Sequence, residues 1–429
     1  MKLAIAGTGY VGLVAGVCFA EKGHSVTCVD VDEEKIARMR RGESPIYEED
    51  LEELLKKNLA AERLSFTTDY AAAYADADAI FIGVGTPEMP DGSANLSCIA
   101  AVCRQIAESV TRDCLVVVKS TVPVGTNDKV EQFIKDTLTR NVTVRVASNP
   151  EFLAQGNAVH DMMHATRIII GTDDEEAERM LQRIYEPFDL PVVSVSRRSA
   201  EMIKYACNDF LALKISYMND IANLCELVGA NIDDVAEGMR YDPRIGAKFL
   251  KAGVGYGGSC FPKDTKALRY LASRHGYRLR TVDAAVEINA EQKTRLFEKA
   301  KSRFITFENM RVAVLGLAFK PGTDDLREAP SLDNIRLLTE QGAQLVCYDP
   351  VAGENFRRRF PDIPLAESAE AALDGAFCCF VFTEWEEIVR LSPEVFRARM
   401  RVPLVYDGRN IFDPETMKNA GVEYYSIGR

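Results

Sequence analysis

The chain has 429 residues, of which 47% are hydrophobic and 27% charged, with a formal net charge of -12 at pH 7. This length exceeds what one hydrophobic core can organise and predicts about three domains. The acidic balance argues against nucleic acid or an anionic membrane surface as the main partner. The eleven cysteines and four histidines have no metal-ligand spacing, and no segment is apolar enough to span a bilayer, so we expect no metal, no membrane and a reduced, cytoplasmic setting.

The first thirty residues have the pattern of a dinucleotide-binding unit. An apolar run over 2–6 precedes a glycine turn, a helical pattern that stops at Gly23 and a second strand over 25–29 that ends at Asp30. In such a unit the glycines allow a tight turn and close approach to a pyrophosphate, and the acid receives the ribose 2'-hydroxyl of NAD. The alternative is an ordinary strand–turn–helix connection. The candidate contacts in the turn are Gly7, Gly9, Tyr10, Val11 and Gly12.

Three later apolar runs, over 79–84, 115–118 and 142–147, predict further strands of the same sheet. Polar residues follow each run: Thr86, Thr121 and Glu151. Ligands of open parallel sheets bind beyond the carboxyl ends of the strands, so these side chains are candidates to face cofactor or substrate. A helix cap is the alternative for each threonine, and a charge at a helix N-terminus is the alternative for Glu151.

Residues 199–228 contain no glycine or proline and carry apolar residues at helical spacing. This predicts one long helix, capped by Ser199 and ended by Gly229, that joins two domains and offers an apolar face to a partner subunit. Lys204 and Asn208 lie four residues apart and therefore share a face of the helix. A solvated face is the alternative for that pair.

A glycine-rich loop over 253–264 delivers Cys260, followed by Pro262, Lys263 and Asp264. Glycine permits a backbone that closely surrounds a ligand, and a neighbouring cation and carboxylate are what a reactive thiolate needs. The alternative is a structural cysteine in a glycine turn. Residues 230–300 are otherwise expected to be mostly helical.

A second αβ pattern begins at Arg311, with strands expected over 312–315, 344–348, 377–382 and 403–406 and a helix over 331–341. It looks like a degenerate nucleotide-binding unit without the three glycines. The predicted fold is therefore α/β, with two Rossmann-like doubly wound domains joined by a long central helix. We expect an NAD-binding domain over 1–198, a central helical domain over 199–305 whose apolar helix face suits dimerisation, and a second Rossmann-like domain over 306–429.

Five motifs in order (GTGYVG with Asp30, SNPEFLAQG, EMIKYACNDF, GYGGSCFPKD and AFKPGTDDLRE) resemble those of the UDP-glucose/GDP-mannose dehydrogenase family, and most closely its UDP-glucose 6-dehydrogenases. The resemblance spans nearly the whole chain and implies that the domain over 306–429 binds the UDP-sugar. It implies an NAD-dependent, four-electron oxidation of UDP-glucose to UDP-glucuronate through a cysteine thiohemiacetal and thioester, carried out by a cytoplasmic homodimer.

The resemblance also implies roles for individual residues. Cys260 would be the nucleophile, Lys204 and Asn208 would polarise the reacting oxygen, Asp264 and Thr121 would hold water, and Glu151 would assist proton transfer. Besides the glycine turn, the implied cofactor contacts are Asp30, Lys35, Thr86, Thr121, Lys263 and Arg327. The implied substrate contacts are Glu151, Phe152, Leu153, Lys204, Asn208, Arg244, Phe249, Gly257, Phe261, Phe319, Lys320 and Arg409. Two places depart from the common family pattern: Gln155 stands where glutamate is frequent, and residues 83–87 differ in the loop before Thr86.

Three alternatives stay open. The same chemistry could act on GDP-mannose or another sugar nucleotide. A simple two-electron dehydrogenase would leave Cys260 structural, and a dinucleotide-sensing protein would keep the fold without turnover. The combination of Lys204, Asn208, Cys260 and Asp264 argues against the last two, because neither needs a thiol beside a glycine loop.

Overall fold

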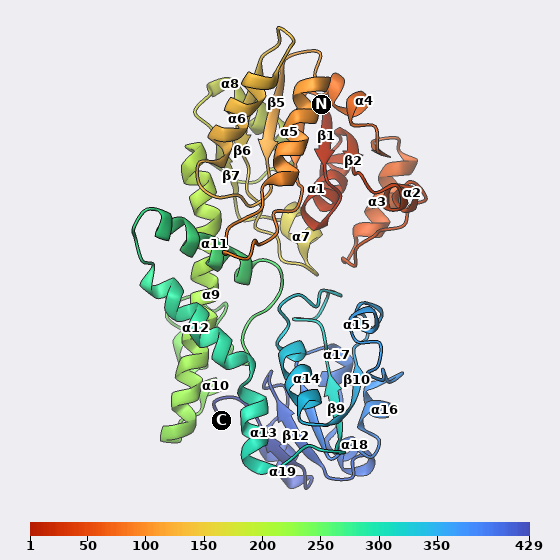
Figure 1. Ribbon diagram of the computed structural model, residues 1–429, viewed down its shortest axis with the longest axis vertical. Coiled ribbons are helices and arrows are strands. Elements are labelled where there is room, and N and C mark those ends of the chain that lie inside the picture. The colour runs from red at the N-terminus through yellow and green to blue at the C-terminus, as the bar shows by residue number, and fades with distance from the viewer. The chain divides into compact units, whose positions relative to one another are not determined.

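The computed structural model describes all residues from Met1 to Arg429, which form two compact units (Figure 1). The first unit spans Met1–Cys207 and the second Asn208–Arg429. The long helix α9 (Arg197–Val228) runs through the boundary between them. No helix is long and apolar enough to cross a membrane.

The first unit is built on an eight-stranded sheet in the order β3-β2-β1-β4-β5-β6-β7-β8. Its neighbouring strands are parallel except for β6 and β7, which meet antiparallel. The order reverses beside β1, which pairs with both β2 and β4, and this is where a doubly wound sheet binds its ligand. The strands are β1 (Lys2–Ala6), β2 (Ser25–Val29), β3 (Leu64–Thr67), β4 (Ala79–Ile82), β5 (Cys114–Val118), β6 (Val144–Ser148), β7 (Ile168–Gly171) and β8 (Val192–Val195).

Alternate residues of these strands fill two separate cores, as the period of two requires. Leu3 and Ile5 of β1 point into one core, whereas Ala4 and Ala6 point into the other. Helices cover both faces, with α1, α3 and α7 in contact on one side and α4, α5 and α6 on the other. The helical segments are α1 (Tyr10–Glu21), α2 (Glu33–Arg40), α3 (Leu51–Ala60), α4 (Tyr70–Ala75), α5 (Ser97–Ser109), α6 (Thr126–Thr137), α7 (Ala158–Met163), α8 (Glu175–Tyr185) and the short η1 (Glu186–Phe188).

The second unit begins with helices and ends with a five-stranded, fully parallel sheet in the order β10-β9-β11-β12-β13. The strands are β9 (Arg311–Leu315), β10 (Gln344–Tyr348), β11 (Cys378–Val381), β12 (Leu404–Asp407) and β13 (Glu423–Tyr425). The helices after α9 are α10 (Ile232–Arg240), α11 (Phe261–Arg274), α12 (Arg280–Lys293), α13 (Arg295–Arg303), α14 (Pro330–Glu340), α15 (Gly353–Arg359), α16 (Ala369–Leu373), α17 (Glu386–Val389), α18 (Pro393–Arg399) and α19 (Pro414–Asn419).

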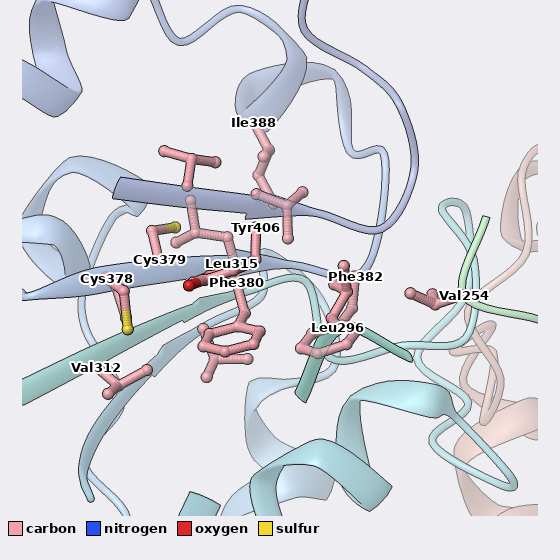
Figure 2. Close-up of a cluster of buried hydrophobic side chains, with 14 of the residues drawn as sticks. Val254, Leu296, Val312, Leu315, Cys378, Cys379, Phe380, Phe382, Ile388 and Tyr406 are labelled. Carbon is pink, nitrogen blue, oxygen red and sulfur yellow. The ribbon is translucent and has the colours of Figure 1, made fainter. Parts of the chain in front are cut away.

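One buried cluster ties the glycine-rich loop to this second sheet (Figure 2). Val254 from the loop and Leu296 from α13 lie at the end of β11 beside Phe382, within the same core as the inward side chains of the strands. The Val254 N–H also donates to the carbonyl of Gly408 at 2.9 Å. The loop that carries Cys260 is therefore anchored on a rigid sheet.

The sequence predicted the architecture correctly: two parallel α/β sheets and a long helix are present. The predicted start of the long helix was wrong by two residues. The helix begins at Arg197, and the hydroxyl of Ser196, not of Ser199, accepts from the backbone at the first turn, where Ser199 N–H donates at 3.2 Å. Its end at Val228, followed by Gly229 with φ +75°, agrees with the prediction. The division into three domains stays a prediction.

Candidate active site

The glycine turn between β1 and α1 has the geometry that close backbone approach requires. Gly7 has φ +95°, a conformation that side-chain-bearing residues rarely adopt. A Cβ on Gly12 would lie 2.0 Å from the Gly7 carbonyl oxygen, whereas a Cβ on Gly9 would meet open space. Gly12 is thus needed for packing, and Gly9 leaves room in front of the α1 N-terminus, where no side chain caps the helix. Such an end is suited to a pyrophosphate.

Asp30 stands at the end of β2 beside this turn. Its Oδ2 accepts from the Thr8 N–H at 2.9 Å and from the Thr8 hydroxyl at 2.6 Å, and its Oδ1 accepts from Asp32 N–H at 3.1 Å. Burial raises the pKa of Asp30, but these hydrogen bonds outweigh burial and leave the pKa below its ordinary value. Asp30 is therefore an ionised, oriented acceptor. Lys35 pairs with Asp32, at 4.0 Å.

Thr86 and Thr121 are brought together at the carboxyl ends of β4 and β5. The Thr86 hydroxyl donates to the Thr121 carbonyl at 2.8 Å, and the hydroxyl of Ser120 donates to the Val84 carbonyl at 2.6 Å. These bonds fasten the loop over 83–87, whose sequence departs from the common family pattern, to the loop that follows β5. Both threonines therefore belong to the same edge of the sheet as Asp30.

Glu151 and Lys204 form a buried ion pair within the first unit. Their Oε1 and Nζ atoms lie 2.9 Å apart, and the two side chains are 6% and 4% exposed. Burial raises the pKa of Glu151, but the Lys204 charge, the Leu153 N–H and the more distant Lys119 outweigh it, so the pKa lies below its usual value. The ring of Phe152 lies under Lys204 Nζ at 5.4 Å. A solvated helix face is therefore the wrong reading of Lys204.

Three charged residues that sequence reasoning did not assign support this part of the site. Lys119 is buried and donates to Asn149 Oδ1 at 3.0 Å, and Glu48 accepts from the Gly156 and Ala158 N–H groups at 2.8 and 2.6 Å. Glu201 accepts from Gly125 and Asn127 at the start of α6. The partners of Glu48 and Glu201 are more than seventy residues away in sequence, so no local pattern signals them. Lys119 directly follows a buried strand, which was a usable signal.

In the second unit, the glycine loop is held by close packing of backbone. Gly255 and Gly258 have φ +85° and +80°. A Cβ on Gly257 would lie 2.4 Å from the Glu328 carbonyl oxygen, and one on Gly258 would lie 2.8 Å from the ring of Phe319. The loop is thus packed against the segment that follows β9, which contains predicted substrate contacts.

Cys260 is half-buried at the N-cap of α11, with its Sγ 3.8 Å from the Ser259 hydroxyl. A helix N-terminus stabilises negative charge, which favours the thiolate. Most of the other cysteines are instead buried. Burial raises the pKa of four of them to about 12: Cys18, Cys103, Cys114 and Cys378.

Asp264 lies one turn into α11 and is 1% exposed. Its Oδ2 accepts from Asn208 Nδ2 at 2.7 Å, and its Oδ1 accepts from Lys263 Nζ at 2.6 Å. The structure thus joins Asn208, Asp264 and Lys263, three predicted site residues, into one polar cluster. Asp209, the neighbour of Asn208, is also buried, but neither of its carboxylate oxygens has a hydrogen-bond partner. Burial first, and Asp264 second, raise the pKa of Asp209 to about 8.

The remaining predicted ligand residues fall into two groups: those that contact other segments of the second unit and those that contact a residue close in sequence. Arg409 donates to the carbonyls of Phe382 at 2.7 Å and Phe319 at 2.9 Å, so it joins the end of β11 to the segment after β9. The Phe261 ring lies 6.4 Å from that of Phe249. Arg244, by contrast, is fully exposed and pairs with Asp242 at 2.6 Å. Arg327 pairs with Asp325 at 2.6 Å, and Lys320 lies over the ring of Phe319. The ligand roles of these residues stay predictions.

Comparison with known proteins identifies the family. Sequence models of the UDP-glucose/GDP-mannose dehydrogenase family match residues 1–189 (NAD binding domain), 198–291 (central domain) and 313–414 (UDP binding domain). UDP-glucose 6-dehydrogenase YwqF of Bacillus subtilis is 47% identical over 100% of this chain and 98% of its own length. The UDP-glucose 6-dehydrogenase of Pseudomonas aeruginosa is 46% identical over the same shares.

A solved structure agrees with the sequence comparison. The UDP-glucose dehydrogenase of Pyrobaculum islandicum superposes with a TM-score of 0.93 at 38% identity, covering 99% of this chain and 96% of that one. The glycine turn and the oriented acid Asp30 fit the NAD that this family uses. The chain therefore belongs to the UDP-glucose/GDP-mannose dehydrogenase family and is an NAD-dependent oxidoreductase.

Proposed function

We propose that this enzyme oxidises the C6 hydroxyl of UDP-glucose to the carboxylate of UDP-glucuronate, with Cys260 as a covalent nucleophile. The observation that carries the proposal is the half-buried thiol at the α11 N-terminus, one turn from the Asn208–Asp264–Lys263 cluster. A thiol in that place has no structural task comparable to those of the fully buried cysteines. Bound NAD supplies the acceptor for the hydride in each of the two oxidation steps.

The covalent step solves a specific chemical problem, because an aldehyde formed halfway would be lost to water. The Cys260 thiolate adds to the aldehyde carbonyl and forms a thiohemiacetal. Loss of the second hydride converts that adduct to a thioester, and water then cleaves the thioester to a carboxylate and the free thiol. In these steps the polar side chains of the site stabilise negative charge on the reacting oxygen and assist proton transfer.

The charged clusters of the two units supply these functions in the proposal. The Lys204 ammonium and the Asn208 amide stabilise negative charge on the reacting oxygen, and a fixed donor contributes about 3 kcal/mol to such stabilisation. Asp264, with Thr121, orients the hydrolytic water, and Glu151 assists its proton transfer. The Glu151–Lys204 pair and the Asn208–Asp264 bond support the roles by showing that these side chains are ordered and charged or hydrogen-bonded.

The substrate assignment rests on the names of the relatives, which are UDP-glucose 6-dehydrogenases, and on the loop residues Phe261, Thr265 and Lys266, which resemble the UDP-glucose version of the loop. Lys320 and Arg409 would attract any sugar diphosphate, so the base must be chosen by the slot near Phe319. We expect kcat/KM for UDP-glucose to exceed that for GDP-mannose by at least about tenfold, which corresponds to about 1.4 kcal/mol of transition-state binding.

The decisive experiment counts electrons. Purified enzyme is given limiting UDP-glucose and excess NAD, and the NADH formed is divided by the UDP-glucose consumed. The expected ratio is two, without free aldehyde. A ratio of one would remove the thioester mechanism, preference for GDP-mannose would overturn the substrate alone, and no turnover of any sugar nucleotide would favour a binding protein.

We also propose that the enzyme is a homodimer that acts in the reducing environment of the cytoplasm. Phe210, Tyr217 and Leu224 recur every seven residues along α9 and are 61%, 52% and 52% exposed. An exposed apolar stripe of this kind is suited to pack against the same stripe of a second copy. None of the eleven cysteines forms a disulfide, which fits a reducing compartment. Sedimentation velocity should give a dimer, and Phe210→Glu should shift the population toward monomer.

A further inference from the structure

Lys119 is a buried cation to which the proposed mechanism gives no task. It follows β5 directly, is 5% exposed, and donates to Asn149 Oδ1 at 3.0 Å. The Tyr185 hydroxyl lies 3.3 Å from its Nζ and donates to the same Asn149 oxygen at 2.5 Å. The Asn149 amide group donates in turn to the Ile169 carbonyl at 2.9 Å. Asn149 is therefore held from three sides.

This arrangement is connected to Glu151 through the backbone. Asn149 is two residues before Glu151, and its N–H donates to the Val118 carbonyl at 2.9 Å, which joins the ends of β5 and β6. Lys119 is likewise two residues before Thr121. The Glu151 carboxylate is then fixed by Lys204 Nζ at 2.9 Å and by Leu153 N–H at 2.6 Å. One ammonium group thus connects the two loops that carry Glu151 and Thr121.

The titratable groups around Lys119 come from four parts of the first unit. Glu151 follows β6, Lys204 lies on α9, Cys18 on α1 and Tyr185 on α8. Burial raises the pKa of both the Cys18 thiol and the Tyr185 hydroxyl, so both are neutral near pH 7. Glu151 is then the anion of this group, and the charges of both Lys204 and Lys119 act on it. Burial lowers the pKa of Lys119 to about 8; Glu151 opposes this shift and Lys204 adds to it.

We propose that Lys119 is a positioning residue of the reaction, which acts through Glu151: it fixes the turn that carries Glu151 and supplies the second positive charge beside its carboxylate. The role rests on the proposed function of Glu151 in proton transfer. A carboxylate between two buried cations stays ionised and immobile, whereas a carboxylate with one cation takes up a proton more readily.

The test measures Glu151 itself, so that it does not depend on which sugar nucleotide is oxidised. Protein labelled with ¹³C at the glutamate side-chain carboxyl is titrated by NMR, and the Glu151 signal is assigned by its loss in Glu151→Gln. In Lys119→Met, which removes the charge and keeps the length of the side chain, the Glu151 pKa should rise. Lys119→Arg should keep it low, because the charge remains.

Tyr185→Phe is the matched control. It removes the other hydrogen bond to Asn149 Oδ1 and leaves the Lys119 charge in place, so Glu151 should titrate as in the wild type. An equal rise in Tyr185→Phe, or no rise in Lys119→Met, would overturn the proposal even if UDP-glucose is oxidised as expected. Conversely, the NMR result would stand if the substrate proved to be another sugar nucleotide.

Two further readouts complete the test. In the wild-type protein, loss of the Lys119 proton should give the Glu151 signal a second inflection, and persistence of that inflection in Lys119→Met would contradict the proposal. In steady-state kinetics, Lys119→Met should lower kcat about tenfold with little change in KM for NAD, a fraction of the effect of a direct acid–base group. Rescue of kcat by Lys119→Arg is expected.

Discussion

Gly7 after β1 and Gly316 after β9 occupy the same place in the two parallel sheets. Both have a positive φ, +95° and +82°. Each donates its N–H, at 2.8 Å, to the last residue of the neighbouring strand: Gly7 to Val29 of β2, and Gly316 to Tyr348 of β10. An aspartate follows each of those strands, Asp30 and Asp349. Each sheet therefore has the same arrangement: a glycine with positive φ after one strand and an aspartate after the neighbouring strand. We call this arrangement the backbone frame.

The two aspartates differ in how many donors they already have. Asp30 is half-buried and accepts three hydrogen bonds, two of them from Thr8. Asp349 is buried and accepts five, three on Oδ2 and two on Oδ1, from Leu317, Ala318, Trp385, Val351 and Ala352. A carboxylate offers about four lone-pair positions, so Asp349 has no capacity left for a ribose hydroxyl. The same residue in the same frame keeps capacity for a further donor in one unit and is saturated by donors of the protein itself in the other.

The segment after the turn differs as well. Helix α1 begins at Tyr10, three residues after Gly7, whereas α14 begins only at Pro330. The residues between Gly316 and α14 include Phe319, which covers Gly258 of the glycine loop. The second frame therefore supports the loop that carries Cys260, whereas the first leaves the α1 N-terminus uncapped within the part of the chain that matches the family's NAD binding domain.

Cys260→Ser gives the largest expected effect. Steady-state turnover should fall by at least about a thousandfold, since the hydroxyl is a far weaker nucleophile than the thiolate. NAD affinity, measured by calorimetry, should stay within about twofold because the glycine turn of the first unit is unaltered. Near-normal turnover would make Cys260 structural and remove the division of tasks between the units.

Asp349→Ala should chiefly reduce stability. It leaves five donors without an acceptor, two or more of them buried, at a cost of about 3–5 kcal/mol in unfolding free energy. Urea unfolding measures the loss, and the NAD Kd of the folded fraction should not change. If Asp349→Ala weakened NAD binding and left stability intact, the two frames would have the same task.

Asp209→Asn extends the comparison to a buried aspartate that, unlike Asp349, accepts no hydrogen bond. Its pKa is raised to about 8, so between about pH 4 and 8 the folded protein holds a proton that the unfolded chain releases. Stability contributed by this group therefore falls as pH rises through that window. Asparagine cannot ionise, so the variant should gain about 1–3 kcal/mol over wild type at pH 8.5 and much less at pH 5.

The exposed Asp220 on the same helix provides the control, since Asp220→Asn should leave the pH dependence of unfolding unchanged. Equal stability of Asp209→Asn and wild type at both pH values would show that water satisfies the Asp209 carboxyl.

Much of this comparison could be read from sequence, and some could not. The glycine spacing and Asp30 predicted the first frame, because local geometry dictates residue type there. The missing glycines correctly indicated a different second unit. Donor saturation of Asp349 could not be foreseen, because Trp385 lies 36 residues away and its indole N–H has no sequence signature.

The site, too, shows local signals in the sequence and contacts that the sequence does not reveal. Motifs singled out Lys204, Asn208, Cys260 and Asp264 as candidates, and the structure pairs Asn208 with Asp264 and Lys204 with Glu151; their roles stay predictions. Burial of Lys204 was not evident from helix periodicity, because a lysine at helical spacing is usually solvated. Strands β3, β7, β8 and β13 were missed; each has three or four residues, a length at which a period-two pattern is weak.

Asp30→Ala should have the smallest effect, and it directly tests the first frame, in which the aspartate keeps capacity for a further donor. Removing the carboxylate removes both a hydrogen-bond acceptor for the ribose 2'-hydroxyl and a charge that repels a 2'-phosphate. The ratio of kcat/KM for NAD over NADP should therefore fall by about tenfold, or about 1.4 kcal/mol, with little change in the melting temperature. Asp32→Ala is the matched control, because Asp32 is two residues away, pairs with Lys35 and caps α2, so its loss should leave the cofactor ratio unchanged. If Asp32→Ala alters the ratio as much as Asp30→Ala does, general charge near the turn selects the cofactor, and the contrast between Asp30 and Asp349 loses its basis in donor count.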